Sequence, residues 1–224
     1  MLRLIKKHHL YFTLTSITLF IFLGISLILN KKESFVLLNG FHCEWLNNFF
    51  IFYTHLGDGL VFIAVVIIFI AFKKRKKAAT LLLGYLSSGV ATLALKRIFL
   101  LPRPKLYFEN MAFEYGHFIP GVTLHGSNAF PSGHTTSVFC LATILILIFK
   151  KQKLCIPCFI VAVTVGYSRI YLAQHFLQDV VFGVFIGTLF GLLSYHCVYK
   201  QKILKPIKKF FKIKKQKSLP LADT

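Results

Sequence analysis

The stretch from Tyr167 to Asp179 carries an arginine, a histidine and an aspartate between two long apolar runs. An ionisable side chain beside bilayer hydrocarbon costs free energy, so each one is a functional candidate whose partner has to be found. If the chain is helical after Leu172, His175 and Asp179 are four residues apart on one face. A carboxylate there fixes the imidazole tautomer and raises the basicity of its free nitrogen, as a base or nucleophile requires. The pair could also be only a capping histidine and a helix-start aspartate.

Two further stretches carry side chains suited to an anion, Lys96 to Pro104 and Pro131 to His134. The candidate phosphate ligands are the cations Lys96, Arg103 and Arg169, and Gly133 lets the backbone come close to the anion. An arginine offers a planar fork that matches phosphate oxygens, and a lysine offers a point charge. Free amides at a helix start attract an anion as well. Each stretch has a simpler reading when taken alone, namely a snorkelling lysine and a capped helix start.

Together these residues fit phosphoryl transfer, which needs an in-line nucleophile, charge neutralisation and a proton for the leaving oxygen. His175, oriented by Asp179, can attack and form a phosphohistidine. His134 can protonate the leaving group and later activate water. Three cations supply the electrostatic stabilisation, so we expect no metal and no cofactor. The sparse carboxylates also argue against a two-metal site.

The three stretches resemble the signature of the type 2 phosphatidic acid phosphatase (lipid phosphate phosphatase) superfamily, KxxxxxxRP, PSGH and SRxxxxxHxxxD. Lys96 to Pro104, Pro131 to His134 and Ser168 to Asp179 match every signature position. The resemblance implies a helical core with its site at the outer membrane–water boundary. It also implies His175 as nucleophile, His134 as acid, Asp179 as the residue that orients the nucleophile, and Lys96, Arg103, Ser132, Gly133 and Arg169 as phosphate ligands.

Composition favours an integral membrane protein, because 56% of the 224 residues are hydrophobic and only 15% are charged. The formal net charge of +20 comes from short basic runs between apolar stretches, not from one patch, which argues against nucleic-acid binding. Cys155 and Cys158 have CxxC spacing, yet no second cysteine or histidine pair completes a zinc site. We therefore expect a lipid bilayer and a phosphorylated membrane lipid as partners, and the oligomeric state stays open.

The apolar runs predict an all-α, six-transmembrane-helix domain over residues 1–199. The predicted spans are about 10–29, 54–72, 78–97, 133–149, 154–171 and 175–198. Most of the 27 basic residues lie in the N-terminus, in 73–77, in 150–153 and in the tail 200–224, which predicts that both termini are cytoplasmic. The site then faces the periplasm of a bacterial inner membrane. Apolar residues recur at helical amphipathic spacing among the lysines of the tail, which is expected to lie on the anionic inner leaflet.

Gly183, Gly187 and Gly191 continue the line of His175 and Asp179 in steps of four. Small residues at this spacing let two helices approach closely. We expect this face to pack against the fourth or fifth span and to hold His175 toward His134.

The sequence thus predicts a membrane phosphatase acting on a lipid phosphomonoester or pyrophosphate. Candidate substrates are lipid A, a polyprenyl pyrophosphate, phosphatidylglycerol phosphate and phosphatidic acid. Two alternatives stay open: a phosphotransferase that passes the phosphoryl group to another acceptor, and a non-enzymatic anion-binding membrane protein. The latter would not need His134, His175 and Asp179 together.

Overall fold

The computed structural model describes residues 2–111 and 113–200, and all regular elements in these residues are helical. In chain order they are α1 (Leu2–Lys7), α2 (His9–Ile28), α3 (Lys31–Asn39), α4 (Glu44–Tyr53), η1 (Thr54–Gly57), α5 (Gly59–Ala71), α6 (Arg75–Phe99), α7 (Pro104–Asn110), α8 (Gly133–Phe149), η2 (Gln152–Leu154), α9 (Cys155–Tyr171) and α10 (Leu177–Tyr199). The all-α prediction is confirmed for this part of the chain. The predicted tail lies outside the described residues, apart from Lys200.

Four helical stretches in the described residues are long and apolar enough to cross a membrane, namely His9–Ile28, Arg75–Asn110, Gln152–Tyr171 and Leu177–Tyr199. A fifth is formed if α4, η1 and α5 make one span, bent by 49°. The remaining predicted span corresponds to α8, which is apolar but has only 17 residues. The structure therefore supports four or five of the six predicted spans by length and composition.

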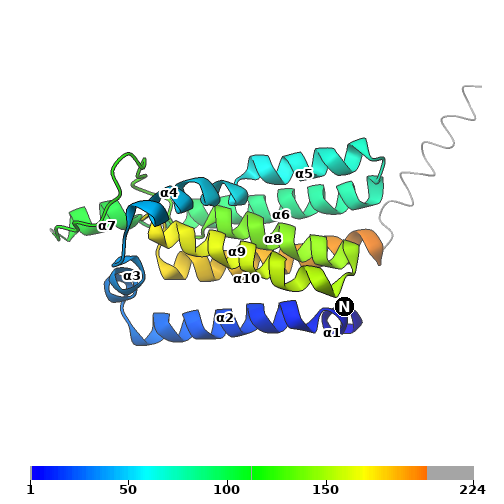
Figure 1. Ribbon diagram of the computed structural model, residues 1–224, viewed down its shortest axis with the longest axis horizontal. Helices are drawn as coiled ribbons and strands as arrows, with labels where there is room; N and C mark the ends of the chain where they lie inside the picture. The colour runs from blue at the N-terminus through cyan, green and yellow to red at the C-terminus, as the bar shows by residue number, and fades with distance from the viewer. Residues whose placement is uncertain (1, 112, 201–224) are drawn as a thin grey trace, which may run out of the picture.

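Helix α8 occupies the centre of the bundle (Figure 1). It contacts α5, α6, α9, α10 and η1, and its side chains are buried on all sides from Val138 to Ile148 apart from Leu145. Such an all-round apolar helix belongs in a core. The outer helices instead expose large apolar side chains, among them Phe20 on α2, Ile67 on α5 and Val90 on α6. An outward apolar surface of this kind fits a bilayer, since lipid takes the place of water there.

The basic segments meet at one end of the bundle. The Gln152 side-chain amide donates to the Lys7 carbonyl at 3.2 Å, and the Lys77 and Lys76 ammonium groups lie 4.6 Å and 4.2 Å from the ring centroids of Phe149 and Tyr199. The end of α6 and the starts of α8 and α10 lie at the opposite end (Figure 1). This arrangement agrees with the charge pattern of the sequence, in which the basic runs share one side of the membrane.

Two helix boundaries differ from the predicted span boundaries. The span predicted over 54–72 begins earlier, at Glu44, and breaks at Asp58, which lies between Gly57 and Gly59. The span predicted from residue 175 begins at Leu177, so His175 lies in the turn before α10 and not on the helix. In both places the backbone turns beside a polar side chain, Asp58 or His175, that contacts a residue of another segment. A hydropathy pattern does not show such contacts.

The glycine face of α10 packs against α8, as predicted. A Cβ atom added at Gly183 would lie 2.9 Å from the Ser132 carbonyl oxygen, and one at Gly191 would lie 2.8 Å from the Thr143 Cβ. At Gly187 it would lie 2.9 Å from the Cys140 backbone nitrogen. Backbone atoms cannot move aside cheaply, so these three positions require glycine for the helices to stay in contact.

Replacing Gly187 with leucine is expected to lower both the thermal unfolding temperature and the activity. The added side chain separates α10 from α8 and overpacks a tight contact, which typically costs about 1–3 kcal/mol or more. Thermal unfolding in detergent and phosphate release would be measured together. The matched control is Gly24→Leu on α2, where an added Cβ meets nothing within 4 Å. Wild-type activity with unchanged thermal stability in Gly187→Leu would contradict the packing argument.

Candidate active site

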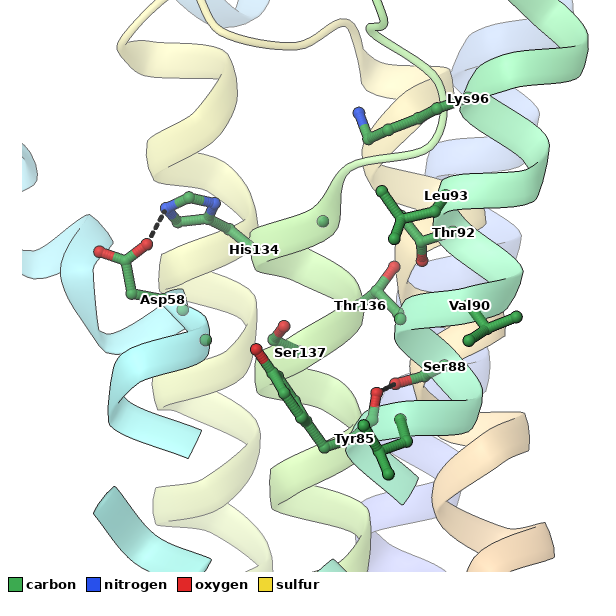
Figure 2. Close-up of a pocket in the computed structure, with 15 residues that line it drawn as sticks. Asp58, Tyr85, Ser88, Val90, Thr92, Leu93, Lys96, His134, Thr136 and Ser137 are labelled. Carbon is green, nitrogen blue, oxygen red and sulfur yellow. Dashed lines mark hydrogen bonds and ion pairs between the residues drawn. The ribbon is translucent and has the colours of Figure 1, made fainter. Parts of the chain in front are cut away.

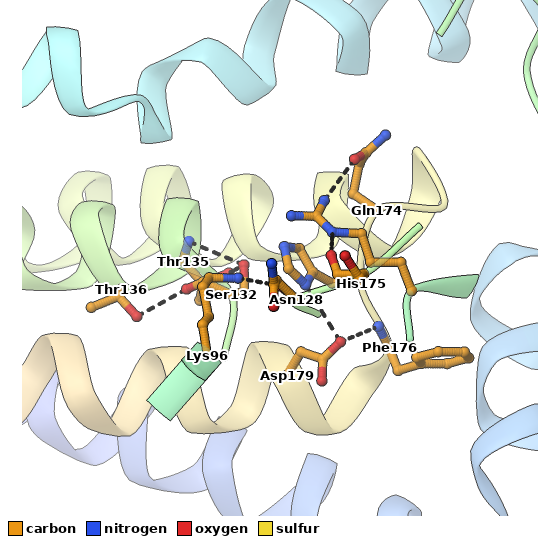
Figure 3. A network of polar contacts seen from close by, with 11 residues as sticks. Lys96, Asn128, Ser132, Thr135, Thr136, Gln174, His175, Phe176 and Asp179 are labelled. Carbon is orange, nitrogen blue, oxygen red and sulfur yellow. Dashed lines mark hydrogen bonds and ion pairs between the residues drawn. The ribbon is translucent and has the colours of Figure 1, made fainter. Parts of the chain in front are cut away.

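The predicted site residues converge where four helix ends meet. The Ser132 backbone N–H, at the start of α8, donates to the Asp179 carbonyl on α10 at 2.9 Å. The backbone N–H of His175 donates to the Arg169 carbonyl, near the end of α9, at 3.1 Å. The Lys96 ammonium, near the end of α6, donates to the Asn128 carbonyl in the loop before α8. Residues far apart in the sequence are therefore joined directly by hydrogen bonds (Figure 3).

His175 and Asp179 form a buried pair, with the His175 Nδ1 atom 3.4 Å from Asp179 Oδ2. Only 2% and 1% of the two side chains are exposed. The same carboxylate oxygen accepts the Phe176 backbone N–H at 2.9 Å, which fixes the carboxylate at the first turn of α10. Contact through Nδ1 leaves Nε2 of His175 as the free nitrogen. The pairing was predicted on one helical face and instead arises between the turn and the helix.

Positive charge surrounds His175. Burial first, and then the charges of Arg103, Arg169 and Lys96, hold the pKa of His175 well below its ordinary value. Removing the imidazole from water disfavours its charged form, and nearby cations do so again. His175 is therefore neutral at physiological pH, which is the form that can attack phosphorus.

Arg103 and Arg169 are held by contacts that leave donors free. Arg103 donates from Nε to the Ser127 carbonyl at 3.0 Å and from Nη1 to the Gln174 side chain at 2.9 Å. Arg169 is 7% exposed and donates from Nη1 to the Thr54 hydroxyl at 2.6 Å. Its buried Nε finds no hydrogen-bond partner within residues 2–111 and 113–200. A buried guanidinium with a free N–H fits a bound oxyanion.

The start of α8 combines a cap with an open approach. The Ser132 hydroxyl oxygen accepts from the Thr135 hydroxyl at 2.9 Å and from the Thr135 backbone N–H at 3.4 Å. This side chain thus caps α8, and its own proton stays available to a ligand. A Cβ added at Gly133 would meet nothing within 4 Å, so the backbone there is open to an approaching group. A helix start with this geometry favours an anion.

His134 makes a contact that sequence reasoning missed. Its Nε2 lies 3.2 Å from Asp58 Oδ1 (Figure 2). The other oxygen of Asp58 lies 2.9 Å from His55 Nδ1. Neither His55 nor Asp58 belongs to a signature stretch. The glycines on both sides of Asp58 are the one sequence signal that could have drawn attention to it, because they mark a close backbone approach.

A groove of about 400 Å³ runs from the site down the outside of the bundle. Lys96 and His134 line it near one end, and Tyr85, Ser88 and Val90 line it farther along α6 (Figure 2). Its other wall includes Gly57, Asp58 and Gly59, between η1 and α5. The groove therefore joins charged groups to an apolar surface.

No group of three or more histidine, cysteine, aspartate or glutamate side chains that could hold a metal ion occurs in the described part of the chain. The polar groups of the site are instead the cations and imidazoles described above.

The model of the PAP2 superfamily matches residues 77–203, more than half of the chain. The chain belongs to the PAP2 superfamily. This match includes all three signature stretches and identifies the PAP2 chain as a phosphatase.

Known proteins resemble this chain over different shares of its length. The lipid A 4'-phosphatase of Porphyromonas gingivalis is 27% identical over 76% of this chain and 72% of its own length. The lipid A 4'-phosphatase of Bacteroides thetaiotaomicron is 40% identical, but only over 34% of this chain and 33% of its own length. The crystal structure of Aquifex aeolicus LpxE matches with a TM-score of 0.64 and 32% identity, over 73% of this chain and 93% of that chain.

Proposed function

We propose that the protein removes a phosphate from a membrane lipid through a phosphohistidine on His175. The observation that carries this proposal is the buried His175–Asp179 pair with Arg103, Arg169 and Lys96 around it. A neutral imidazole needs no activation beyond orientation, and Asp179 supplies that through Nδ1. Three cations, one of them with a free buried N–H, match the charge spread over the oxygens of a transferring phosphoryl group.

The reaction has two steps. In the first, Nε2 of His175 attacks phosphorus while the bond from phosphorus to the leaving oxygen breaks, and His134 donates a proton to that oxygen. In the second, His134 takes a proton from a water molecule whose oxygen attacks phosphorus, and the bond between phosphorus and His175 breaks. Inorganic phosphate leaves, and both imidazoles return to their starting states.

A lipid substrate is supported by the groove beside α6. The phosphate would lie among the cations while an apolar chain extends along Val90 and Leu93 toward the bilayer. The substrate classes are those predicted from sequence, and the resemblance to two lipid A 4'-phosphatases favours a lipid A phosphate among them. Comparing these substrates on one preparation would rank them.

We further propose that residues 1–199 cross the inner membrane of a bacterium six times, with α8 as the shortest span and both termini in the cytoplasm. The site then faces the periplasm. This orientation is supported by the gathering of Lys7, Lys76, Lys77 and Gln152 at the end of the bundle away from the site. The basic tail 200–224 would follow on the cytoplasmic side.

The orientation predicts which cysteine a membrane-impermeant maleimide labels from the periplasmic side. Cys43, in the turn between α3 and α4, is the exposed free cysteine of the described residues, whereas Cys140 and Cys155 are buried. Strong labelling of Cys43 in cells with a permeabilised outer membrane is expected, and Cys43→Ser should remove it. Labelling that appears only after the inner membrane is broken would reverse the proposed orientation.

The function itself is tested by phosphate release from purified protein in detergent. The panel contains lipid A, a polyprenyl pyrophosphate, phosphatidylglycerol phosphate and phosphatidic acid, with His175→Ala as the control. Vanadate, which mimics a five-coordinate phosphoryl group, should inhibit. Adding acceptor alcohols separates hydrolysis from phosphotransfer, because transfer yields a new phosphate ester. A folded wild-type protein that releases no phosphate from any of these lipids would contradict the proposal.

A further inference from the structure

Asp58 occupies the N-cap position of α5 but makes no side-chain hydrogen bond to that helix. An aspartate there ordinarily accepts a backbone N–H of the first turn. The carboxylate of Asp58 instead faces two histidines, with Oδ1 3.2 Å from His134 Nε2 and Oδ2 2.9 Å from His55 Nδ1. Its orientation toward His134 therefore serves a purpose other than capping.

The backbone on both sides of Asp58 is shaped for this contact. A Cβ added at Gly57 would lie 2.9 Å from the His134 Cβ and 2.7 Å from Val165 Cγ1. One added at Gly59 would collide with the Tyr85 hydroxyl on α6. Glycine at position 57 therefore lets the break between η1 and α5 lie directly against α8, and glycine at position 59 lets it lie against α6. The bend of 49° occurs at this point, so the bent helix pair delivers Asp58 to His134.

We propose that Asp58 is a positioning residue for His134, and that His55 connects this pair with solvent. The proposal rests on the proposed phosphatase function. With Nε2 held by Asp58, the Nδ1 atom of His134 is the one that gives its proton to the leaving oxygen and later takes a proton from the attacking water. The Nε2 proton stays on His134 throughout and is donated in a hydrogen bond to the Asp58 carboxylate, whose negative charge balances the imidazolium, much as an aspartate does for the histidine of a hydrolase triad.

The surroundings of His134 make this carboxylate important. Arg169 from α9 and His175 from the turn before α10 interact electrostatically with His134, and so do His55 and Asp58. Lys96 from α6 lines the same groove. Asp58 is the anionic member of this set. Without its charge the imidazolium faces cations and neutral groups, so the protonated acid persists only to a lower pH.

Asp58→Asn is the direct test, because it keeps the shape and removes the charge. We expect kcat for an alkyl lipid phosphate to fall about tenfold to a hundredfold, part of what general acid catalysis contributes, with little change in KM. The alkaline limb of the kcat profile should move to lower pH. Hydrolysis of p-nitrophenyl phosphate, whose leaving group needs little protonation, should fall much less. Asp58→Glu should recover part of the loss, and Asp58→Asn should add nothing in a His134→Ala protein.

The matched control is Glu44→Gln, an equivalent change at an exposed carboxylate on α4, which should leave kcat and the pH profile unchanged. A folded Asp58→Asn protein with the wild-type kcat, or with equal losses on both substrates and an unshifted profile, overturns the proposal. If Asp58→Asn does not fold, His55→Gln decides, because an unchanged kcat and pH profile there also overturns it. Wild-type activity that needs His134 but not Asp58 contradicts only this inference, whereas an inactive wild-type protein contradicts the proposed function.

Discussion

A His175→Ala protein is expected to lose phosphate release by a factor on the order of 10⁴ to 10⁶, the range seen when a covalent nucleophile is removed. No neighbouring group in the site can replace it. His134 is engaged by Asp58, and the charged side chains around His175 other than Asp179 are the cations Arg103, Arg169 and Lys96. The measurement is single-turnover phosphate release with the best lipid of the panel, together with acid-labile labelling of the protein by ³²P-labelled substrate.

The control for this change is His9→Ala, since His9 is exposed at the opposite end of the bundle. It should keep wild-type kcat and the acid-labile label. Removing His175 also removes a buried side chain, so thermal unfolding has to be followed in parallel. A folded His175→Ala protein that still forms the label, or keeps a tenth of the wild-type rate, would exclude His175 as the nucleophile.

Arg169→Lys is expected to lower kcat about 10²- to 10³-fold, although the positive charge is conserved. The Arg169 guanidinium donates from Nη1 to the Thr54 hydroxyl and leaves Nε free. One planar group can therefore bind Thr54 and the phosphoryl oxygens at the same time. An ammonium has a different shape and cannot make both sets of contacts. Steady-state kinetics with the preferred lipid would measure the loss, which should appear mainly in kcat.

Arg97→Lys provides the comparison, because Arg97 is exposed next to Lys96 on the same helix and lies outside the signature positions. It should leave kcat within about twofold of wild type, as surface substitutions usually do. If Arg169→Lys behaved like Arg97→Lys, a point charge would suffice and the role of the planar fork would be wrong.

Much of the site could be predicted because its residues are concentrated in short stretches at the ends of apolar runs. Lys96, His134 and Arg169 each lie within a few residues of a helix end, and the alternation of basic runs predicted which ends share a side. The four-residue spacing of Gly183, Gly187 and Gly191 likewise predicted the contact with α8, because periodicity along one helix is a local property.

Asp58 could not be predicted in the same way. It reaches His134 only because a span bends at that residue, and the bend arises from contacts between segments distant in sequence. The position of His175 before α10 is a similar case, since the turn is fixed by hydrogen bonds to Arg169. The hydropathy pattern showed no break at Asp58, and it placed His175 at the start of a span and not in the turn before it.

The close contact of α10 with α8 also separates two tasks within the bundle. The proposed nucleophile His175 and its partner Asp179 lie on the side where α10 packs closely against α8 through glycine, whereas the groove follows the other side, along α6. Substitutions at Leu86, Val90 or Leu93 can therefore change which hydrocarbon tails fit while the reacting groups keep their geometry. Acyl-chain preference can thus diverge among homologous enzymes without any loss of chemical competence.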